Sequence, residues 1–420
     1  MNKKFFIKTL GCKTNEIESQ IIKESLLNKG YIKTDNRLEA DIYILNSCTV
    51  TSHSDNQALY LIKQIRKDKP DIKIILTGCL AQTGNPDEIN ADLILGNNEK
   101  LDIDKYIEKL FEKNKAVFAD NIFNTKEYNN KFLYNASSTR PSVKIQDGCN
   151  NRCSYCLIPY ARGNSRSNNI ENIIKQINLH IKNNKKEIVL TGIHIGQWGI
   201  EFNQNLINLL KEIEKTDILR YRLGSLYINE IDDNLLEFLQ NSKKFCPHFH
   251  LSLQSLTDKT LKNMNRFYTR KEALDKINKI HGCFNLPYIG CDIITGFPDE
   301  TKDDFLITKE SLIEAKVSYI HSFPYSIRKN TPAAAMENQI LEHIKKERTK
   351  ELIEISNLLH KNFLDKNKNT TRTIIYEKKS KKMNAYKGVS ENYIKVYKKS
   401  ETDLQNTVET VALSEFEELY

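Results

Sequence analysis

Three cysteines close together in the chain have the spacing of an iron–sulfur ligand set. Cys149, Cys153 and Cys156 form a C-x3-C-x2-C run directly after a strand expected at 143–147, so their thiols should surround one small volume. Three thiolates satisfy three irons of a cubane cluster and leave the fourth iron open to a substrate or cofactor. A structural zinc site needs a fourth protein ligand, and no further Cys or His stands close by. The run therefore predicts a catalytic [4Fe-4S] cluster rather than a zinc knuckle.

Three further cysteines, Cys12, Cys48 and Cys79, are distant in the chain but share one context. Each follows an apolar, strand-like stretch and stands beside Gly or Ser. In a parallel sheet with helices on both faces, the C-terminal ends of neighbouring strands share one edge, where ligands usually bind. Three buried core cysteines are the alternative, but core cysteines rarely fall at three matching strand ends. We therefore predict a second cluster here, whereas Cys246, Cys283 and Cys291 are expected to be small buried side chains.

The elements that position these cysteines follow from apolar periodicity. Residues 1–117 alternate apolar runs with amphipathic stretches, as a doubly wound parallel α/β domain does, with strands expected at 4–10, 41–47, 73–78 and 91–95. Residues 118–140 have no sustained period and are expected to be a linker. Residues 141–367 predict an open (βα)6 barrel with a trailing helix near 339–364. Its strands are expected at 143–147, 187–191, 219–225, 247–253, 288–295 and 317–323.

The last segment and the overall composition complete this description. Residues 368–420 alternate β-like runs at 373–376, 393–397 and 407–413 with polar turns, which predicts a small β-barrel. The 420 residues are 39% apolar and 28% charged, and no window approaches the ~18 apolar residues of a membrane span. The basic N-terminus is interrupted by Lys8 before a secretory core could form, and nine cysteines are too few for a disulfide scaffold. We therefore expect a cytoplasmic protein with reduced thiols.

The loop at 149–156 resembles the radical S-adenosylmethionine superfamily in its cysteine spacing and in the aromatic residue before the last cysteine, Tyr155. The resemblance implies an incomplete βα barrel in which S-adenosylmethionine chelates the open iron and is cleaved by an electron from the cluster. It would yield methionine and a 5′-deoxyadenosyl radical. Polar positions at later strand ends are candidates for holding the cofactor, although each could equally be a turn or capping residue: Thr191, Gly192, Ser225, Gln254 and Arg266.

Over nearly its whole length the chain resembles the methylthiotransferases, which join dispersed N-terminal cysteines, a radical barrel and a C-terminal RNA-binding barrel of the TRAM type. The matching stretches are 9–15 (TLGCKTN), 46–51 (NSCTVT), 77–82 (TGCLAQ), 146–167, 250–255 (HLSLQS) and 294–298 (ITGFP). The resemblance implies two [4Fe-4S] clusters, the second of which supplies or carries sulfur. A second S-adenosylmethionine would supply the methyl group, so that C–S–CH3 replaces an unactivated C–H bond.

The short stretches at 146–150 (QDGCN) and 159–167 (PYARGNSRS) are most similar to the threonylcarbamoyl (MtaB-like) branch. This branch implies methylthiolation at C2 of N6-threonylcarbamoyladenosine at tRNA position 37, next to the anticodon. The expected partners are the tRNA anticodon stem-loop, an electron donor such as flavodoxin or ferredoxin, and a sulfur source. Two other branches stay open: isopentenyladenosine tRNA methylthiotransferases and ribosomal protein aspartate methylthiotransferases. A non-catalytic, metal-stabilised RNA-binding protein is the alternative of another class.

Two features of the second half bear on the resemblance. After Gly296-Phe297-Pro298 the family usually has Gly-Glu, and here Asp299 has to adopt the positive-φ turn, which Asp tolerates better than most residues. The segment 371–400 carries nine basic residues against two acidic ones, and among them stand Tyr376, Tyr386, Tyr393 and Tyr397. RNA loops are bound by such cations and aromatic rings. The candidate RNA contacts are Lys378, Lys379, Lys381 and Lys382, although a charge run is often only a solvated face.

Overall fold

The computed structural model describes residues 3–112 and 115–420, and its N-terminal part is a parallel sheet with the strand order β2-β1-β3-β4-β5-β6. The strands are β1 (Lys4–Thr9), β2 (Ile32–Lys33), β3 (Ile42–Ser47), β4 (Lys73–Gly78), β5 (Leu93–Leu95) and β6 (Ala116–Phe118). The four predicted strands are confirmed. β2 and β6 were not predicted because such short edge strands carry no periodic signal, and β6 ends where the linker was expected to begin.

Helices cover both faces of this sheet, as predicted for a doubly wound domain. Ile22 and Leu26 of α1 (Lys13–Asn28) pack on one face, and Ile62 and Ile65 of α2 (Ser52–Asp68) pack on the other. Two short helices, α3 (Cys79–Thr83) and α4 (Ile103–Tyr106), complete this part. The strand order reverses between β1 and β3, and such a switch point opens a crevice at the C-terminal ends of the strands.

The segment that follows β6 crosses from the N-terminal sheet to the barrel without a long helix or strand. Leu133 and Ala136 in this segment are buried against Ile17 and Ile21 of α1. Tyr128 donates a hydrogen bond to the Lys144 carbonyl at 2.9 Å. The segment is therefore packed between the two halves and contributes to their contact.

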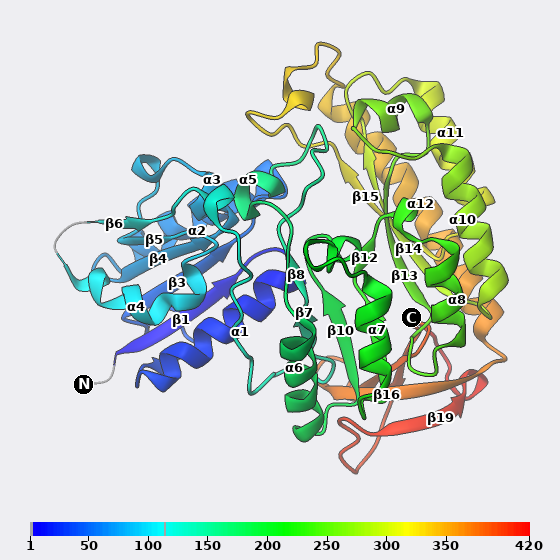
Figure 1. Ribbon diagram of the computed structural model, residues 1–420, viewed down its shortest axis with the longest axis horizontal. Helices are drawn as coiled ribbons and strands as arrows, with labels where there is room; N and C mark the ends of the chain where they lie inside the picture. The colour runs from blue at the N-terminus through cyan, green and yellow to red at the C-terminus, as the bar shows by residue number, and fades with distance from the viewer. Residues whose placement is uncertain (1–2, 113–114) are drawn as a thin grey trace.

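The middle of the chain forms the open βα barrel that was predicted (Figure 1). Its strands are parallel and follow chain order: β7 (Ser142–Lys144), β10 (Glu187–Thr191), β11 (Arg220–Leu223), β12 (Ser225–Leu226), β13 (His248–Gln254), β14 (Tyr288–Thr295) and β15 (Tyr319–Pro324). The predicted strand 219–225 is divided at Gly224, which donates to the Leu190 carbonyl at 2.8 Å. A Cβ at Gly224 would stand 3.0 Å from that oxygen, so the close approach favours glycine.

The outer layer of the barrel consists of helices whose apolar faces pack on these strands. They are α6 (Ile170–Lys182), α7 (Leu206–Glu214), α8 (Asp233–Asn241), α9 (Asp258–Asn263), α10 (Arg270–Cys283) and α11 (Lys302–Glu314). Cys246 and Cys291 are fully buried in the barrel part and Cys283 is half-buried, close to the prediction of small buried side chains. Asp299 has φ 63°, as the turn after Gly296 was expected to require.

A long helix, α12 (Glu342–Asn367), leads from the barrel to an antiparallel sheet with the order β18-β17-β16-β19. Its strands are β16 (Thr371–Ser380), β17 (Ala385–Ser390), β18 (Lys395–Lys398) and β19 (Val408–Ala412). This small sheet is consistent with the predicted TRAM-like module, although β17 was not predicted. Figure 1 places β16 and β19 below the barrel strands, and Arg220 of β11 donates to the Thr373 carbonyl at 2.7 Å. Within the described residues, no helix has the length and apolar character that a bilayer crossing needs.

Candidate active site

The loop with Cys149, Cys153 and Cys156 lies between two short paired strands, β8 (Gln146–Asp147) and β9 (Arg166–Ser167). Gly148, at φ 73°, turns the chain into the loop, and a Cβ there would stand 2.0 Å from the Asn164 carbonyl oxygen. The backbone N–H of Cys149 donates to Gly163 at 3.1 Å, and that of Ser154 donates to Met264 at 3.1 Å. Backbone hydrogen bonds thus hold the loop on both sides.

The three thiols of this loop are close enough to affect one another. Burial raises the pKa of Cys149 to about 11 and that of Cys156 to about 12, and in both cases the Cys153 thiolate raises it further. Positive or polar groups approach the sulfurs: Arg266 Nη1 lies 3.8 Å from Cys153 Sγ, and His194 Nδ1 lies 3.4 Å from Cys149 Sγ. No set of three His, Cys, Asp or Glu side chains in residues 3–112 and 115–420 is already arranged around a metal position. The donor set, two buried thiols and one partly exposed thiol whose charged forms would repel one another, nevertheless fits a group whose cations replace the thiol protons.

The structure brings the other triplet together at one edge of the N-terminal sheet. Ser47 and Gly78 are paired in register, so the cysteines that follow them begin at the same level. Gly11 precedes Cys12, and a Cβ at Gly11 would stand 2.7 Å from Cys48 Sγ. Burial raises the pKa of Cys48 to about 11, and the Cys79 and Cys12 thiolates also raise it. Convergence of the three strand ends, inferred from their matching contexts, is therefore observed.

The five candidates for S-adenosylmethionine contact lie in different surroundings. Thr191 and Gln254 end β10 and β13, and Ser225 begins β12 and lies 2.7 Å from His250 Nδ1. Gly192 packs against Gln146, whose carbonyl oxygen would be 2.9 Å from an added Cβ. Arg266 stacks over the Tyr227 ring at 3.8 Å and reaches the cysteine loop at Cys153. Of the five, Arg266 is the residue whose side chain the structure places against the cysteine loop.

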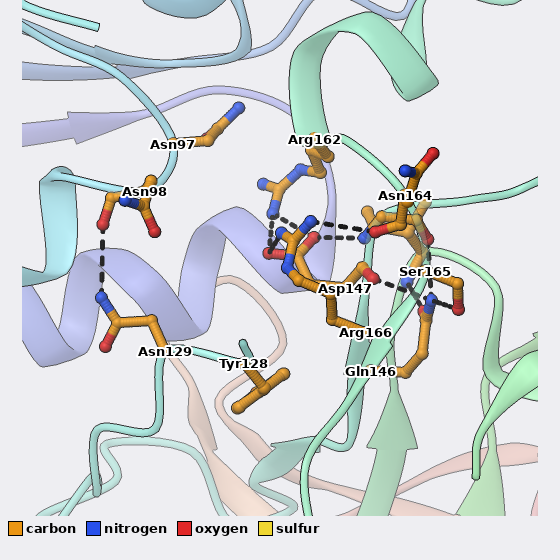
Figure 2. Close-up of polar contacts among 12 residues, drawn as sticks. Asn97, Asn98, Tyr128, Asn129, Gln146, Asp147, Arg162, Asn164, Ser165 and Arg166 are labelled. Carbon is orange, nitrogen blue, oxygen red and sulfur yellow. Dashed lines mark hydrogen bonds and ion pairs between the residues drawn. The ribbon is translucent and has the colours of Figure 1, made fainter. Parts of the chain in front are cut away.

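A buried group of charges between the two halves was not predicted from the sequence. Arg162, in α5 (Ile158–Arg162) just after the cysteine loop, bonds Glu18 of α1 at 2.9 Å and Asp147 of β8 at 3.0 Å. Lys100 and Lys144 bond the same Glu18 at 2.5 and 2.7 Å. Figure 2 shows Arg162 and Asp147 facing each other beside Arg166. We call these five residues, Glu18, Lys100, Lys144, Asp147 and Arg162, the interface charge cluster.

Neighbouring residues, chiefly Asn15 and Asn97, connect the interface charge cluster to both cysteine triplets. Burial would raise the pKa of Glu18, but Arg162 and Lys100 hold it well below its usual range, so the carboxylate stays ionised. Arg162 also donates to Asn15 Oδ1 at 2.7 Å, three residues after Cys12. Asn97 donates to the Ala161 carbonyl at 2.7 Å, lies 3.7 Å from Cys79 Sγ and accepts from Lys100 at 2.6 Å. The charges therefore fix the cysteine loop relative to the strand ends.

Comparisons with known proteins agree with this architecture. Residues 4–96 match the model of the uncharacterized protein family UPF0004, and residues 143–312 match that of the radical SAM superfamily. A threonylcarbamoyladenosine tRNA methylthiotransferase MtaB from Aquifex aeolicus is 38% identical over 94% of this chain and 96% of its own length. The chain belongs to the methylthiotransferase family of radical SAM enzymes. It is therefore a transferase whose cofactors are S-adenosylmethionine and [4Fe-4S] clusters, two of which are typical of this class.

Two other relatives and one solved structure are also similar to this chain. The Bacillus subtilis MtaB is 36% identical over 94% of the chain and 90% of its own length. A tRNA-2-methylthio-N(6)-dimethylallyladenosine synthase from Clostridium botulinum is 33% identical over 84% of the chain and 81% of its own length. The solved radical S-adenosylmethionine methyltransferase TsrM from Kitasatospora setae is 12% identical, covers 79% of this chain and 75% of its own, and has a TM-score of 0.57. That similarity shows a shared fold. Family membership favours the enzyme over a non-catalytic RNA-binding protein.

Proposed function

We propose that this enzyme methylthiolates C2 of N6-threonylcarbamoyladenosine at position 37 of tRNA. The observation that carries the proposal is the 38% identity to the Aquifex aeolicus threonylcarbamoyladenosine enzyme, which extends over nearly the whole of both chains. The dimethylallyladenosine synthase is less similar over a smaller share. On this proposal residues 1–117 form the methylthiotransferase domain, 118–140 the linker, 141–367 the radical barrel and 368–420 the TRAM-like module. A tRNA substrate also fits the expected cytoplasmic location.

In this proposal Cys149, Cys153 and Cys156 hold the cluster that has an open iron. When bound, this cluster and S-adenosylmethionine supply the radical that removes a hydrogen atom from an unactivated C–H bond. Support comes from the three neighbouring thiols, whose pKa values burial and mutual proximity raise at Cys149 and Cys156, and from Arg266, which brings positive charge to Cys153. Thr191, Gly192, Ser225 and Gln254 are assigned with Arg266 to the cofactor because active groups in such barrels gather at the C-terminal strand ends.

Cys12, Cys48 and Cys79 are assigned to the second cluster, which receives sulfur for transfer. Their support is the convergence at the switch point of the N-terminal sheet, where crevices in such sheets take ligands. The methyl group comes from a second S-adenosylmethionine, the sulfur from a separate sulfur source, and the electron from a donor such as flavodoxin or ferredoxin.

Four lysines at the tip of the β16–β17 hairpin are proposed to contact the anticodon stem-loop. Lys378, Lys379, Lys381 and Lys382 are all exposed, as phosphate contacts require. Tyr376 and Tyr386, which the sequence suggested as stacking platforms, are instead buried in the core of this sheet. Exchanging the four lysines for glutamate should weaken tRNA binding and flatten its salt dependence while S-adenosylmethionine cleavage stays intact. Unchanged affinity at physiological salt would remove the assignment.

The substrate is tested by comparing tRNA nucleosides from cells with and without the gene, by chromatography and mass spectrometry. Loss of the 2-methylthio derivative of N6-threonylcarbamoyladenosine, restored by the wild-type gene but not by a Cys149→Ala gene, is the expected result. If the 2-methylthio derivative of isopentenyladenosine is lost instead, the enzyme belongs to the other tRNA branch. If the tRNA nucleosides are unchanged but the ribosomal protein aspartate lacks its methylthio group in cells without the gene, the enzyme belongs to the ribosomal protein branch.

A further inference from the structure

A cavity of about 170 Å³ lies where all parts of the chain meet. Its lining includes Lys13 of α1, Arg140 of the segment that follows β6, Arg222 of β11, His248 of β13 and Tyr393 of the C-terminal module. A cavity of this size, lined by polar and charged side chains, has room for a small polar group. Its walls, unlike an apolar core void, carry several cations.

Most of these cations already have partners, and Lys13 does not. Arg222 Nε bonds Glu187 at 2.8 Å, and Arg140 Nε bonds Glu377 at 2.8 Å. Lys13 has no hydrogen bond or ion pair to the residues that the structure describes, although it borders the cavity. Glu16, one turn along α1, also lines the cavity, but it forms no ion pair with Lys13 within 4 Å. The Lys13 ammonium group is therefore the cation available to a ligand.

Two further groups in the wall, His248 and Tyr393, have an unpaired polar atom and an unusual backbone angle, respectively. His248 is 9% exposed, and its Nδ1 has no hydrogen-bond partner, which is costly for a buried polar atom. Tyr393, whose ring centre is 4.4 Å from that of His248, has φ 71°, a strained value for an aromatic residue. Burial alone would raise the pKa of Tyr393, but Lys13, Arg140 and other cations lower it, which shows a positive local field.

We propose that this cavity receives the carboxylate of the threonylcarbamoyl group, with Lys13 as its counter-ion and His248 and Tyr393 as hydrogen-bonding neighbours. The inference rests on the proposed function and adds the basis of its substrate choice. C2 of adenine and the carbon that bears the N6 substituent are both bonded to N1, so the reacting carbon and the substituent share one edge of the base. A cation for the carboxylate must then lie close to the sulfur-bearing site. Lys13 directly follows Cys12, so their Cα atoms are about 3.8 Å apart.

The test uses the full-length enzyme with both clusters and two anticodon stem-loop RNAs. One RNA carries N6-threonylcarbamoyladenosine, and in the other the threonyl carboxylate is replaced by a carboxamide. The wild type should bind the carboxylate RNA about ten-fold more tightly, as expected for a charge-assisted contact. Lys13→Gln should lose this preference, and Lys13→Arg should keep most of it. Binding is measured by fluorescence anisotropy and methylthiolation by single-turnover assays.

The matched control is Lys23→Gln, which changes a lysine of the same helix that does not line the cavity. Iron content and thermal midpoint of both variants should match those of the wild type, which shows that each variant is folded and carries its clusters. The inference is overturned if Lys13→Gln retains the wild-type preference, or if the wild type methylthiolates both RNAs but binds them equally. A wild-type enzyme that methylthiolates neither RNA would instead overturn the proposed function, so the two failures are distinguishable.

Discussion

The two cysteine triplets reach similar arrangements by opposite routes. Cys149, Cys153 and Cys156 stand on one loop, whose shape is fixed by Gly148 and by backbone hydrogen bonds at its two ends. Cys12, Cys48 and Cys79 come from three separate strand ends, and they converge only because the sheet is correctly paired. The first triplet is therefore a local feature that short-range sequence spacing specifies. The second is a property of the whole N-terminal domain, and damage anywhere along that sheet edge should affect it.

Removing each triplet should give the largest and most different effects. Changing Cys149, Cys153 and Cys156 to alanine should abolish both 5′-deoxyadenosine formation and methylthiolation. Changing Cys12, Cys48 and Cys79 should abolish methylthiolation but leave S-adenosylmethionine cleavage. Iron and sulfide analysis after anaerobic purification should fall from about eight irons per chain to about four in each variant. A loop variant that still completes the reaction would refute the assignment, and stoichiometric zinc without sulfide would contradict both clusters.

Breaking the interface charge cluster should separate the triplets functionally. Arg162→Met leaves Glu18 and Asp147 with fewer cations in a dry interface, and removing one partner of a buried pair costs about 3–5 kcal/mol. Methylthiolation should fall more than S-adenosylmethionine cleavage, because the loop and the strand ends lose their fixed relation.

The matched control for Arg162 is Arg37→Met, which removes a half-exposed ion pair to Asp68 and should cost less than about 1 kcal/mol. Denaturant unfolding and the two activities measure these effects. Equal losses in the two variants would show that the interface charge cluster has no special role.

One methyl group, added at Gly11 or at Gly30, should separate damage to the strand-end triplet (Cys12, Cys48 and Cys79) from a general loss of stability. Gly11 and Gly30 both have positive φ, near 94° and 85°. A Cβ at Gly11 would collide with Cys48, whereas a Cβ at Gly30 would meet nothing within 4 Å. Gly30→Ala should therefore lower the free energy of unfolding by only about 1–2 kcal/mol, the cost of a positive φ for alanine, and it should keep the full iron content. Gly11→Ala should in addition lose iron from the strand-end triplet while S-adenosylmethionine cleavage persists, and equal iron contents would contradict the collision.

The sequence was most informative where contacts are local. The strands that precede the six cysteines, the open barrel and the positive φ of Asp299 were all predicted, because periodicity and short spacing determine them. Glu18 was not recognised, since a carboxylate on an amphipathic helix usually faces water, yet it is 1% exposed between the two halves. Tyr376 and Tyr386 were misjudged for the opposite reason: they look like accessible rings among lysines but form the core of the C-terminal sheet. The role of Lys13 depends on a cavity that exists only after the domains dock.

The interface charge cluster also constrains how this sequence can diverge. Glu18 and Arg162 are separated by 144 positions in the chain. Replacing either one alone would leave the other as a buried charge that lacks its partner. A mutational path between relatives therefore has to exchange these residues together or retain them all. Among relatives, the residues of the interface charge cluster should therefore change together rather than independently: Glu18, Lys100, Lys144, Asp147 and Arg162.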